Sequence, residues 1–380
     1  MKKAYVTLCF LLLLTFFIPK GAHALSVSAQ FACVMDMQTG QVLYEKNAHE
    51  KHSMASTTKI MTALLAIENG NPDDMVKVSK NAAGTEGTSL YLAAGDTVLL
   101  SDLIYGLMLQ SGNDAAIAIA EHISGSVDAF AAEMTKRAKD IGAANTAFQN
   151  PNGLDAEGHY TTAYDLALIT RAALANHTFA EICATKQKSI RNGTQTVINH
   201  NKLLAMYPGC VGVKTGFTKK TGRCLVSSAQ KDGRQFICVT LNAPDDWNDH
   251  TRLLNYAFDN TIRFPLLAKG MTVNAVSVTN GTSDSVEVTS DEDFYLTERT
   301  ETKFQNTEIR LKLPARILAP VQKGEILGVA EIYHNGNPLH RVNLLAAADV
   351  PYAESKPATQ FLKFFKKLLH FSCTGGQNIV

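Results

Sequence analysis

A serine and a lysine stand three residues apart in an apolar run over residues 54–68. Apolar side chains recur in this run at helical spacing, at Ile60, Leu64 and Ile67. The run therefore predicts a helix with one face on a core, and Ser56 and Lys59 share its first turn. A serine becomes a nucleophile when an adjacent base takes its proton, and a lysine is such a base when burial or neighbours lower its pKa. The pair predicts acyl transfer.

Two more short polar motifs follow later in the chain, Ser111-Gly112-Asn113 and Lys214-Thr215-Gly216. Each of the three motifs occurs twice, and the second copies begin at Ser228, Ser79 and Lys220. No single motif is therefore informative. The second Ser-x-x-Lys runs from a predicted strand into a turn, and the second Lys-Thr-Gly lies in a turn, whereas Lys214 ends an apolar strand. The ordered combination is what indicates a site.

The elements that must position these motifs are strands on either side of a helical lobe. Residues 31–47 contain two strand patterns joined by a turn at Gly40. After about Gln195 three strands are predicted, at Cys210–Lys214, Arg223–Ala229 and Gln235–Leu241. A helix over Asp249–Phe258 follows them. Two strands before the lobe and three after it predict one antiparallel five-stranded sheet with helices packed on it, an α/β (α+β) sandwich.

Within the lobe, serine and threonine residues mark where helices begin. The predicted helices, each written from its N-cap, are Ser101 to about Gln110, Ser126 to Ile141 and Thr162 to about Ala175. The Ser111 motif interrupts the helical pattern before it resumes over residues 114–123. That motif is therefore expected at a junction between two helices.

The overall composition is that of an ordinary globular protein. The chain has 380 residues, 46% of them hydrophobic, and a formal net charge of +1. This length is sufficient for two domains. The balanced charge gives no reason to expect a nucleic-acid partner.

Residues 1–24 have the pattern of a signal peptide. Lys2 and Lys3 precede an apolar stretch over residues 4–18, and Ala22-His23-Ala24 matches a signal-peptidase site. We predict cleavage after Ala24 and an exported protein on the outer face of the bacterial cytoplasmic membrane or in the cell wall. An uncleaved anchor is the alternative, for which the stretch is short.

The character of the sequence changes near residue 265. Residues 265–352 are short Val, Thr, Ile and Leu runs broken by glycine turns, which predict a small all-β domain. In the tail, residues 353–380, five apolar side chains lie opposite lysines at helical spacing: Phe361, Phe364, Phe365, Leu368 and Leu369. This amphipathic helix is predicted to bind an anionic membrane surface, and docking on the protein itself or on a partner is the alternative.

Six of the seven cysteines follow the predicted signal peptide, without the spacing of a zinc site. If Asp232-Gly233 forms a two-residue turn, Lys231 pairs with Arg234, and Cys238 then faces Ser227 rather than a cysteine. Buried free thiols are the preferred interpretation, and export leaves disulfides open.

Taken in order, the three motifs resemble those of the low-molecular-weight penicillin-binding proteins, the serine-type D-alanyl-D-alanine carboxypeptidases. The resemblance is carried by Met54–Thr62, Ser111-Gly112-Asn113 and Val211–Thr218, and it covers nearly the whole chain. Thr221 departs from the family, which usually has alanine there. The resemblance implies a β-lactamase/transpeptidase-like catalytic domain, which we place at residues 25–264.

For the catalytic residues the resemblance implies an acyl-enzyme mechanism. Ser56 would attack the carbonyl between the two terminal D-alanines of a peptidoglycan stem peptide. Lys59 would take the serine proton, and Ser111 would relay a proton to the leaving amine. Water would then release the acyl group, with no metal or organic cofactor, and β-lactam antibiotics would act as covalent inhibitors.

The remaining motif residues are implied to bind substrate. Asn113 would bind the peptide backbone and hold the catalytic lysine. Lys214 and Thr215 would bind the terminal carboxylate, and Gly216 would let the peptide lie close to its strand. The backbone N–H of Phe217 would complete an oxyanion hole with that of the nucleophile.

Three questions stay open at this point. Arg252 is a candidate second partner for the carboxylate, with solvation on a helix surface as the equal alternative. A serine β-lactamase is the nearest competing activity, although no partner carboxylate motif for fast deacylation is evident. A non-catalytic wall-binding protein with the same fold is the third hypothesis.

Overall fold

The computed structural model describes residues 25–300 and 307–353. The chain forms two compact units that divide between Ile262 and Arg263, two residues before the predicted boundary. The predicted signal peptide, and the predicted amphipathic helix within residues 354–380, lie outside the described residues. Within the described ranges, none of the helices combines the length and the apolar character needed to cross a membrane.

The first unit is built on the predicted five-stranded sheet, which has the order β2-β1-β9-β8-β7. All of its pairings are antiparallel. In that order the strands are Val42–Lys46, Phe31–Asp36, Arg234–Leu241, Gly222–Lys231 and Cys210–Thr218. The strand that carries the Lys-Thr-Gly motif, β7, is therefore an edge strand, four residues longer than predicted.

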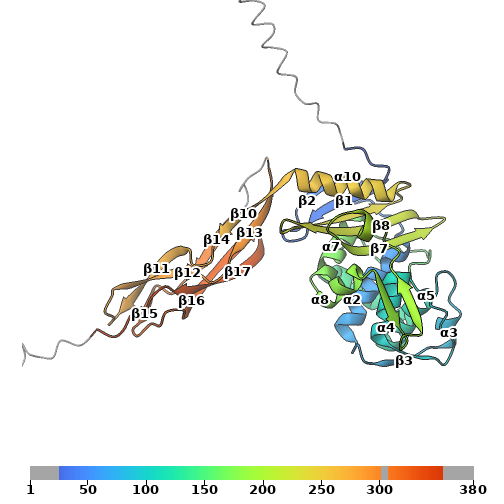
Figure 1. The fold of residues 1–380 in the computed structure, drawn as a ribbon, viewed down its shortest axis with the longest axis horizontal. Coiled ribbons are helices and arrows are strands. Elements are labelled where there is room, and N and C mark those ends of the chain that lie inside the picture. The colour runs from blue at the N-terminus through green and yellow to red at the C-terminus, as the bar shows by residue number, and fades with distance from the viewer. Residues whose placement is uncertain (1–24, 301–306, 354–380) are drawn as a thin grey trace, which may run out of the picture. The chain divides into compact units, whose positions relative to one another are not determined.

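Both faces of this sheet are covered, as β1 shows residue by residue. Cys33 and Met35 pack into the core shared with the helical lobe, and Ala32 and Val34 pack into the core shared with α10, Asp246–Asp259. Alternate side chains of a strand point to opposite faces, so a strand with helices on both sides is apolar throughout. Figure 1 shows α10 on one side of the sheet, and α2 (Lys59–Asn69) and α7 (Ala163–Leu174) on the other.

The helical lobe lies between β2 and β7 in the chain. It begins with a 3-10 turn at Ala55–Thr58 and contains a π-helix at Gly106–Gln110. Its α-helices, from α2 to α9, are Lys59–Asn69, Lys80–Ala83, Leu100–Tyr105, Asn113–Ser124, Val127–Ile141, Ala163–Leu174, His177–Ala184 and Leu203–Met206. Two two-stranded sheets complete it, β3 with β4 and β5 with β6: Met75–Lys77, Thr97–Leu99, Gln187–Ile190 and Gln195–Ile198.

Two of the three predicted caps are confirmed. Ser126 accepts a hydrogen bond from Ala129 N at 3.1 Å, and Thr162 accepts one from Asp165 N at 3.0 Å. The prediction for Ser101 was wrong, because α4 begins at Leu100 and no side-chain hydrogen bond caps it. The α10 prediction was also inaccurate, since that helix starts three residues earlier than expected.

The β8–β9 hairpin has the predicted register. Lys231 pairs with Arg234, and Cys238 pairs with Ser227. The five cysteines within the described ranges are free thiols: Cys33, Cys183, Cys210, Cys224 and Cys238. The preferred interpretation of free thiols is confirmed for these five, and Cys373 lies outside the described residues.

The second unit is all-β, as predicted. Its main sheet has the order β14-β16-β17-β12-β11-β15, and β10 pairs separately with β13. From β10 to β17 the strands are Thr261–Leu267, Thr272–Thr279, Ser285–Ser290, Phe294–Arg299, Thr307–Lys312, Arg316–Leu318, Ile326–His334 and Asn337–Ala346. Val288, Ile332, Val342 and Leu344 are fully buried at its core.

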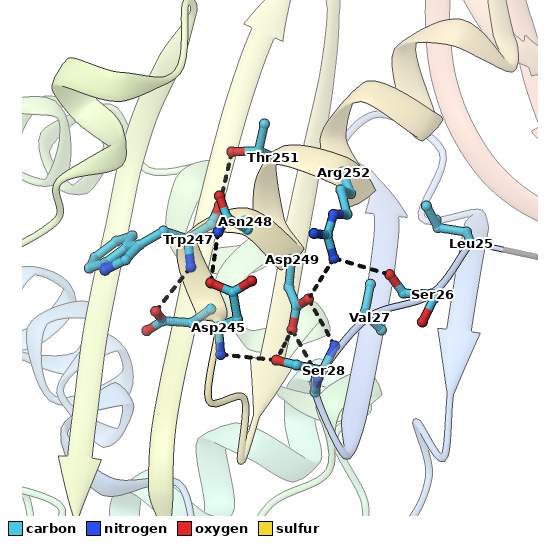
Figure 2. A network of polar contacts seen from close by, with 12 residues as sticks. Leu25, Ser26, Val27, Ser28, Asp245, Trp247, Asn248, Asp249, Thr251 and Arg252 are labelled. Carbon is cyan, nitrogen blue, oxygen red and sulfur yellow. Dashed lines mark hydrogen bonds and ion pairs between the residues drawn. The ribbon is translucent and has the colours of Figure 1, made fainter.

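In the first unit, the segment before β1 is tied to the first turns of α10 (Figure 2). The buried carboxylate of Asp249 accepts hydrogen bonds from Ser28 N at 2.9 Å, Ser28 Oγ at 2.7 Å and Ala29 N at 2.8 Å. Asp245 N donates in turn to Ser28 Oγ at 3.0 Å. These contacts hold the start of α10 against the sheet.

Candidate active site

The Ser56–Lys59 pair lies where the 3-10 turn at Ala55–Thr58 becomes α2. The Lys59 amine lies 2.9 Å from Ser56 Oγ, so the spacing places the two groups within hydrogen-bond distance as expected. Lys59 Nζ also lies 2.7 Å from Asn113 Oδ1 and 2.6 Å from the carbonyl of Asn152. Three segments distant in sequence therefore converge on one amine.

Burial sets the charge state of this amine. Lys59 has no exposed surface, and desolvation lowers its pKa well below 10.5. The nearby Lys214 charge lowers the pKa further, and Asp114 opposes the shift. A neutral amine has two N–H donors and one lone pair. The amide oxygen of Asn113 and the carbonyl of Asn152 can take the two hydrogens, which leaves the lone pair for the serine hydroxyl.

A glycine in the loop that follows α6 packs against the serine turn. Gly153 has φ +88°, and a Cβ at this position would overlap the carbonyl of Ala55 and the backbone nitrogen of Ser56. Ala55 itself has φ +47°, an unfavourable conformation for a residue with a side chain. The close packing therefore leaves no room for a side chain at residue 153, beside the turn that carries Ser56.

The Ser111 motif joins the π-helix to α5, as the interrupted helical pattern indicated. Ser111 has φ +67° and lies almost buried at this junction. Two residues on, Asn113 Nδ2 donates to the carbonyl of Glu86 at 2.7 Å while Oδ1 faces Lys59. The opposite ends of one amide group are thus engaged, and this orients Asn113 toward the lysine.

On β7, the Lys-Thr-Gly motif runs past the serine. A Cβ on Gly216 would lie 3.1 Å from Ser56 N and from Met54 O, so only glycine allows this approach without displacement. Lys214 is buried, and desolvation lowers its pKa to about 7. Its amine donates to the carbonyl of Thr215 at 3.0 Å. The Phe217 side chain is 62% exposed, which is consistent with a backbone role for this residue.

These groups surround a pocket of about 310 Å³. It is lined by Ser56, Thr88, Ser111, His200, Thr215, Gly216, Phe217, Arg223, Asp246 and Trp247. Five of the eight predicted site residues belong to this lining. Lys59 and Asn113 are joined to it by the hydrogen bond between them and by the contact between Lys59 and Ser56, and Lys214 is buried next to Thr215.

The sequence prediction missed part of this lining: Thr88, His200, Arg223, Asp246 and Trp247. Arg252, the candidate second partner for the substrate carboxylate, is not among the residues that line the pocket. Its guanidinium lies 3.9 Å from Asp249 and 3.5 Å from the carbonyl of Ser26 (Figure 2). The one available signal was the register of the β7–β8 hairpin, in which Arg223 faces Phe217.

The second copies of the motifs have structural roles. Ser79 caps α3 by accepting from Ala82 N at 2.9 Å, beside a larger hollow of about 610 Å³ on the lobe surface, away from the serine. Thr221 is buried in the β7–β8 turn, within hydrogen-bond distance of Ser53 and Asp155. Ser228 accepts from the Gln235 amide. None of these copies has the geometry of a nucleophile and its base.

Over residues 25–300 and 307–353, the structure contains no group of three or more His, Cys, Asp or Glu side chains arranged to hold a metal ion.

Comparison with known proteins identifies the family. Residues 18–245 match the family model described as D-alanyl-D-alanine carboxypeptidase. The chain belongs to this family. Residues 263–352 match a second model, the C-terminal domain of penicillin-binding protein 5.

Named relatives and solved structures agree with this assignment. D-alanyl-D-alanine carboxypeptidase DacF of Bacillus subtilis is 34% identical over 92% of this chain and 91% of its own length. DacA of Escherichia coli is 31% identical over 90% and 88%. Penicillin-binding protein 5 of Haemophilus influenzae is 29% identical over 86% of this chain and 98% of its own, with a TM-score of 0.64.

The close approach of Gly153 to the serine turn gives a testable prediction. Gly153→Ala should lower the rate of acylation by a fluorescent penicillin by about 100-fold, because displacing Ser56 by about 1 Å has an effect of that size. Gly193→Ala is the matched control, since Gly193 also has a positive φ, +84°, but a Cβ there meets no atom within 4 Å. Equal acylation rates in the two variants would contradict the proposed packing role.

Proposed function

We propose that this chain is a carboxypeptidase that removes the terminal D-alanine from peptidoglycan stem pentapeptides through an acyl-enzyme on Ser56. The observation that carries the proposal is the buried amine of Lys59, whose pKa is lowered, at 2.9 Å from Ser56 Oγ and beside a pocket of about 310 Å³. The family assignment supports the same reaction.

In the first half of the reaction, Ser56 Oγ attacks the carbonyl between the two D-alanines while Lys59 takes its proton. The negative oxygen that forms is stabilised by the backbone N–H groups of Ser56 and Phe217. Collapse breaks the C–N bond, and a proton relayed through Ser111 leaves with the amine of free D-alanine. An ester of Ser56 remains.

In the second half, water attacks this ester with Lys59 again as the base. The products are the shortened peptide, which ends in a carboxylate, and the regenerated serine. A penicillin would acylate the same oxygen through its strained amide, and its larger acyl group would leave more slowly.

The substrate peptide would lie along β7. This strand is an edge of the sheet, so its outer N–H and C=O groups can pair with an added strand. Lys214 and Thr215 would bind the terminal carboxylate, and Asn113 would bind the peptide backbone. Gly216 supports this placement, since its missing side chain keeps β7 close to Ser56.

The pocket lining favours this activity over a β-lactamase. In class A β-lactamases, fast deacylation uses a carboxylate that activates water. Among the residues that line the pocket, the only carboxylate is that of Asp246, and it is engaged by Arg223 at 2.9 Å. Slow turnover of benzylpenicillin is therefore expected.

Replacing the nucleophile tests the proposal directly. Ser56→Ala should lower release of D-alanine from a defined pentapeptide by about 10⁴-fold or more, because no other group can form the ester. Intact mass spectrometry after incubation with benzylpenicillin should show one adduct on the wild-type protein and none on the variant. A wild-type protein without an adduct would favour the non-catalytic wall-binding hypothesis.

The two buried lysines predict a bell-shaped dependence of kcat/KM on pH for a D-Ala-D-Ala peptide. The acid limb rises as Lys59 loses its proton, at a pH well below 10.5 because burial lowers its pKa. The alkaline limb falls above pH about 7, where Lys214 loses the charge that attracts a carboxylate. A rate that rises continuously to pH 10.5 would contradict a depressed Lys59 pKa.

The location of the reaction follows from its substrate, which lies outside the cytoplasm. We propose that residues 1–24 direct export, that residues 25–264 and 265–352 are the catalytic and β domains, and that residues 353–380 attach the enzyme to the membrane surface. The proposal for the tail rests on its amphipathic sequence, with apolar residues opposite lysines.

Removing the tail tests its proposed role. Deleting residues 358–380 should move the protein from the membrane pellet to the soluble fraction, because the apolar face and the lysines are lost together. Hydrolysis of a soluble pentapeptide by the truncated protein should stay within about twofold of that by the full chain. A truncated protein that still sediments with membranes would show that attachment resides elsewhere.

A further inference from the structure

A cation that stays charged at neutral pH, placed beside Lys214, would strengthen binding of a terminal carboxylate. Lys59 and Lys214, the two lysines of the motifs, are both buried, and burial lowers their pKa values, that of Lys214 to about 7. His200 is also shifted toward its neutral form by burial. An arginine guanidinium keeps its charge throughout this range. Among the residues that line the pocket, Arg223 is the one permanent cation.

Arg223 is held in place by two neighbours at the start of α10. Its Nη2 donates to Asp246 Oδ1 at 2.9 Å, and its guanidinium lies 5.8 Å from the ring centroid of Trp247. Trp247 N donates to the same Asp246 oxygen at 2.9 Å. The Arg223 side chain is 42% exposed, but that of Asp246 is 4% exposed. The pocket therefore presents the guanidinium and conceals the carboxylate.

The guanidinium has spare hydrogen-bonding capacity. Within the described ranges, Arg223 Nε has no hydrogen-bond partner, but it is buried, so pairing with a carboxylate in the pocket would use the terminal Nη nitrogens. On the neighbouring strand, Arg223 faces Phe217, two residues beyond Thr215, and all three residues line the pocket. A planar guanidinium with free donors binds a carboxylate through two parallel hydrogen bonds.

We propose that Arg223 binds the terminal carboxylate of the substrate, and that Asp246 and Trp247 are positioning residues that orient its guanidinium. This inference rests on the proposed function, because it names the residue that recognises the substrate's free C-terminus. The contacts of Ser28 with Asp245 and Asp249 fix the turn of α10 that carries both positioning residues.

The test uses two D-alanyl thioesters that differ only in charge. The leaving group of one is mercaptoacetate, which carries a carboxylate, and that of the other is its methyl ester. Thioesters are activated, so turnover of the neutral compound is measurable. Arg223→Gln should lower kcat/KM about 100-fold for the carboxylate substrate and less than about threefold for the ester. Arg223→Lys, which keeps the charge and loses the planar fork, should give an intermediate loss for the carboxylate substrate alone.

Arg252→Gln is the matched control, since Arg252 is also bonded near the start of α10 and does not line the pocket. It should leave both rates unchanged. Equal losses on the two substrates in Arg223→Gln would indicate a purely structural role and overturn the inference, as would no loss on either. Wild-type protein inactive on both substrates would instead overturn the proposed function, and with it this inference.

Discussion

The active site depends on a lysine amine held away from water. Transferring an ammonium ion into a protein interior costs several kcal/mol, roughly, so the buried amine of Lys59 favours its neutral form. A neutral amine still requires hydrogen-bond acceptors, and these come from Asn113 on α5 and from the carbonyl of Asn152. The helical lobe must therefore close around the amine before Lys59 can act as the proposed base for Ser56. The same burial of Lys59 thus serves both the packing of the lobe and the lowered pKa that the proposed catalysis needs.

The electrostatics near this amine are arranged without a buried ion pair. Asp114 is the one carboxylate that acts on the Lys59 pKa, and its oxygens accept from Ser89 Oγ, Leu90 N and Leu92 N. Those hydrogen bonds stabilise the carboxylate and fix the loop between α3 and β4. Because Asp114 is engaged in this way, it does not form the direct salt bridge that would hold Lys59 protonated. The charge of the second lysine, Lys214, repels that of a protonated Lys59 and so also lowers the pKa of Lys59.

Local patterns made much of this structure predictable. The periodicity of residues 54–68 placed Ser56 beside Lys59, and the Asp232-Gly233 turn gave the correct register of β8 with β9. The missed part of the pocket is assembled from the β8 strand and the start of α10, which sequence spacing does not bring together. An α10 predicted to start at Asp249 had no place for Asp246 and Trp247. Arg252 is six residues beyond Asp246, about 9 Å along the helix axis, so it reaches the Ser26 segment instead.

The side of the pocket formed by Arg223, Asp246 and Trp247 depends on contacts between the two ends of the first unit. Ser28 donates to Asp249, 221 residues away, and β1 lies between β2 and β9 in the sheet. The start of α10, and with it the orientation of Arg223 by Asp246, is therefore defined only when the segment before β1 has docked. The base and the substrate-binding wall are thus set by different parts of the fold. Lys59 requires closure of the helical lobe, whereas Arg223 requires closure of the sheet around β1. If Arg223 binds substrate as proposed, substitutions in the Ser28 segment are expected to affect recognition of substrate rather than activation of the nucleophile.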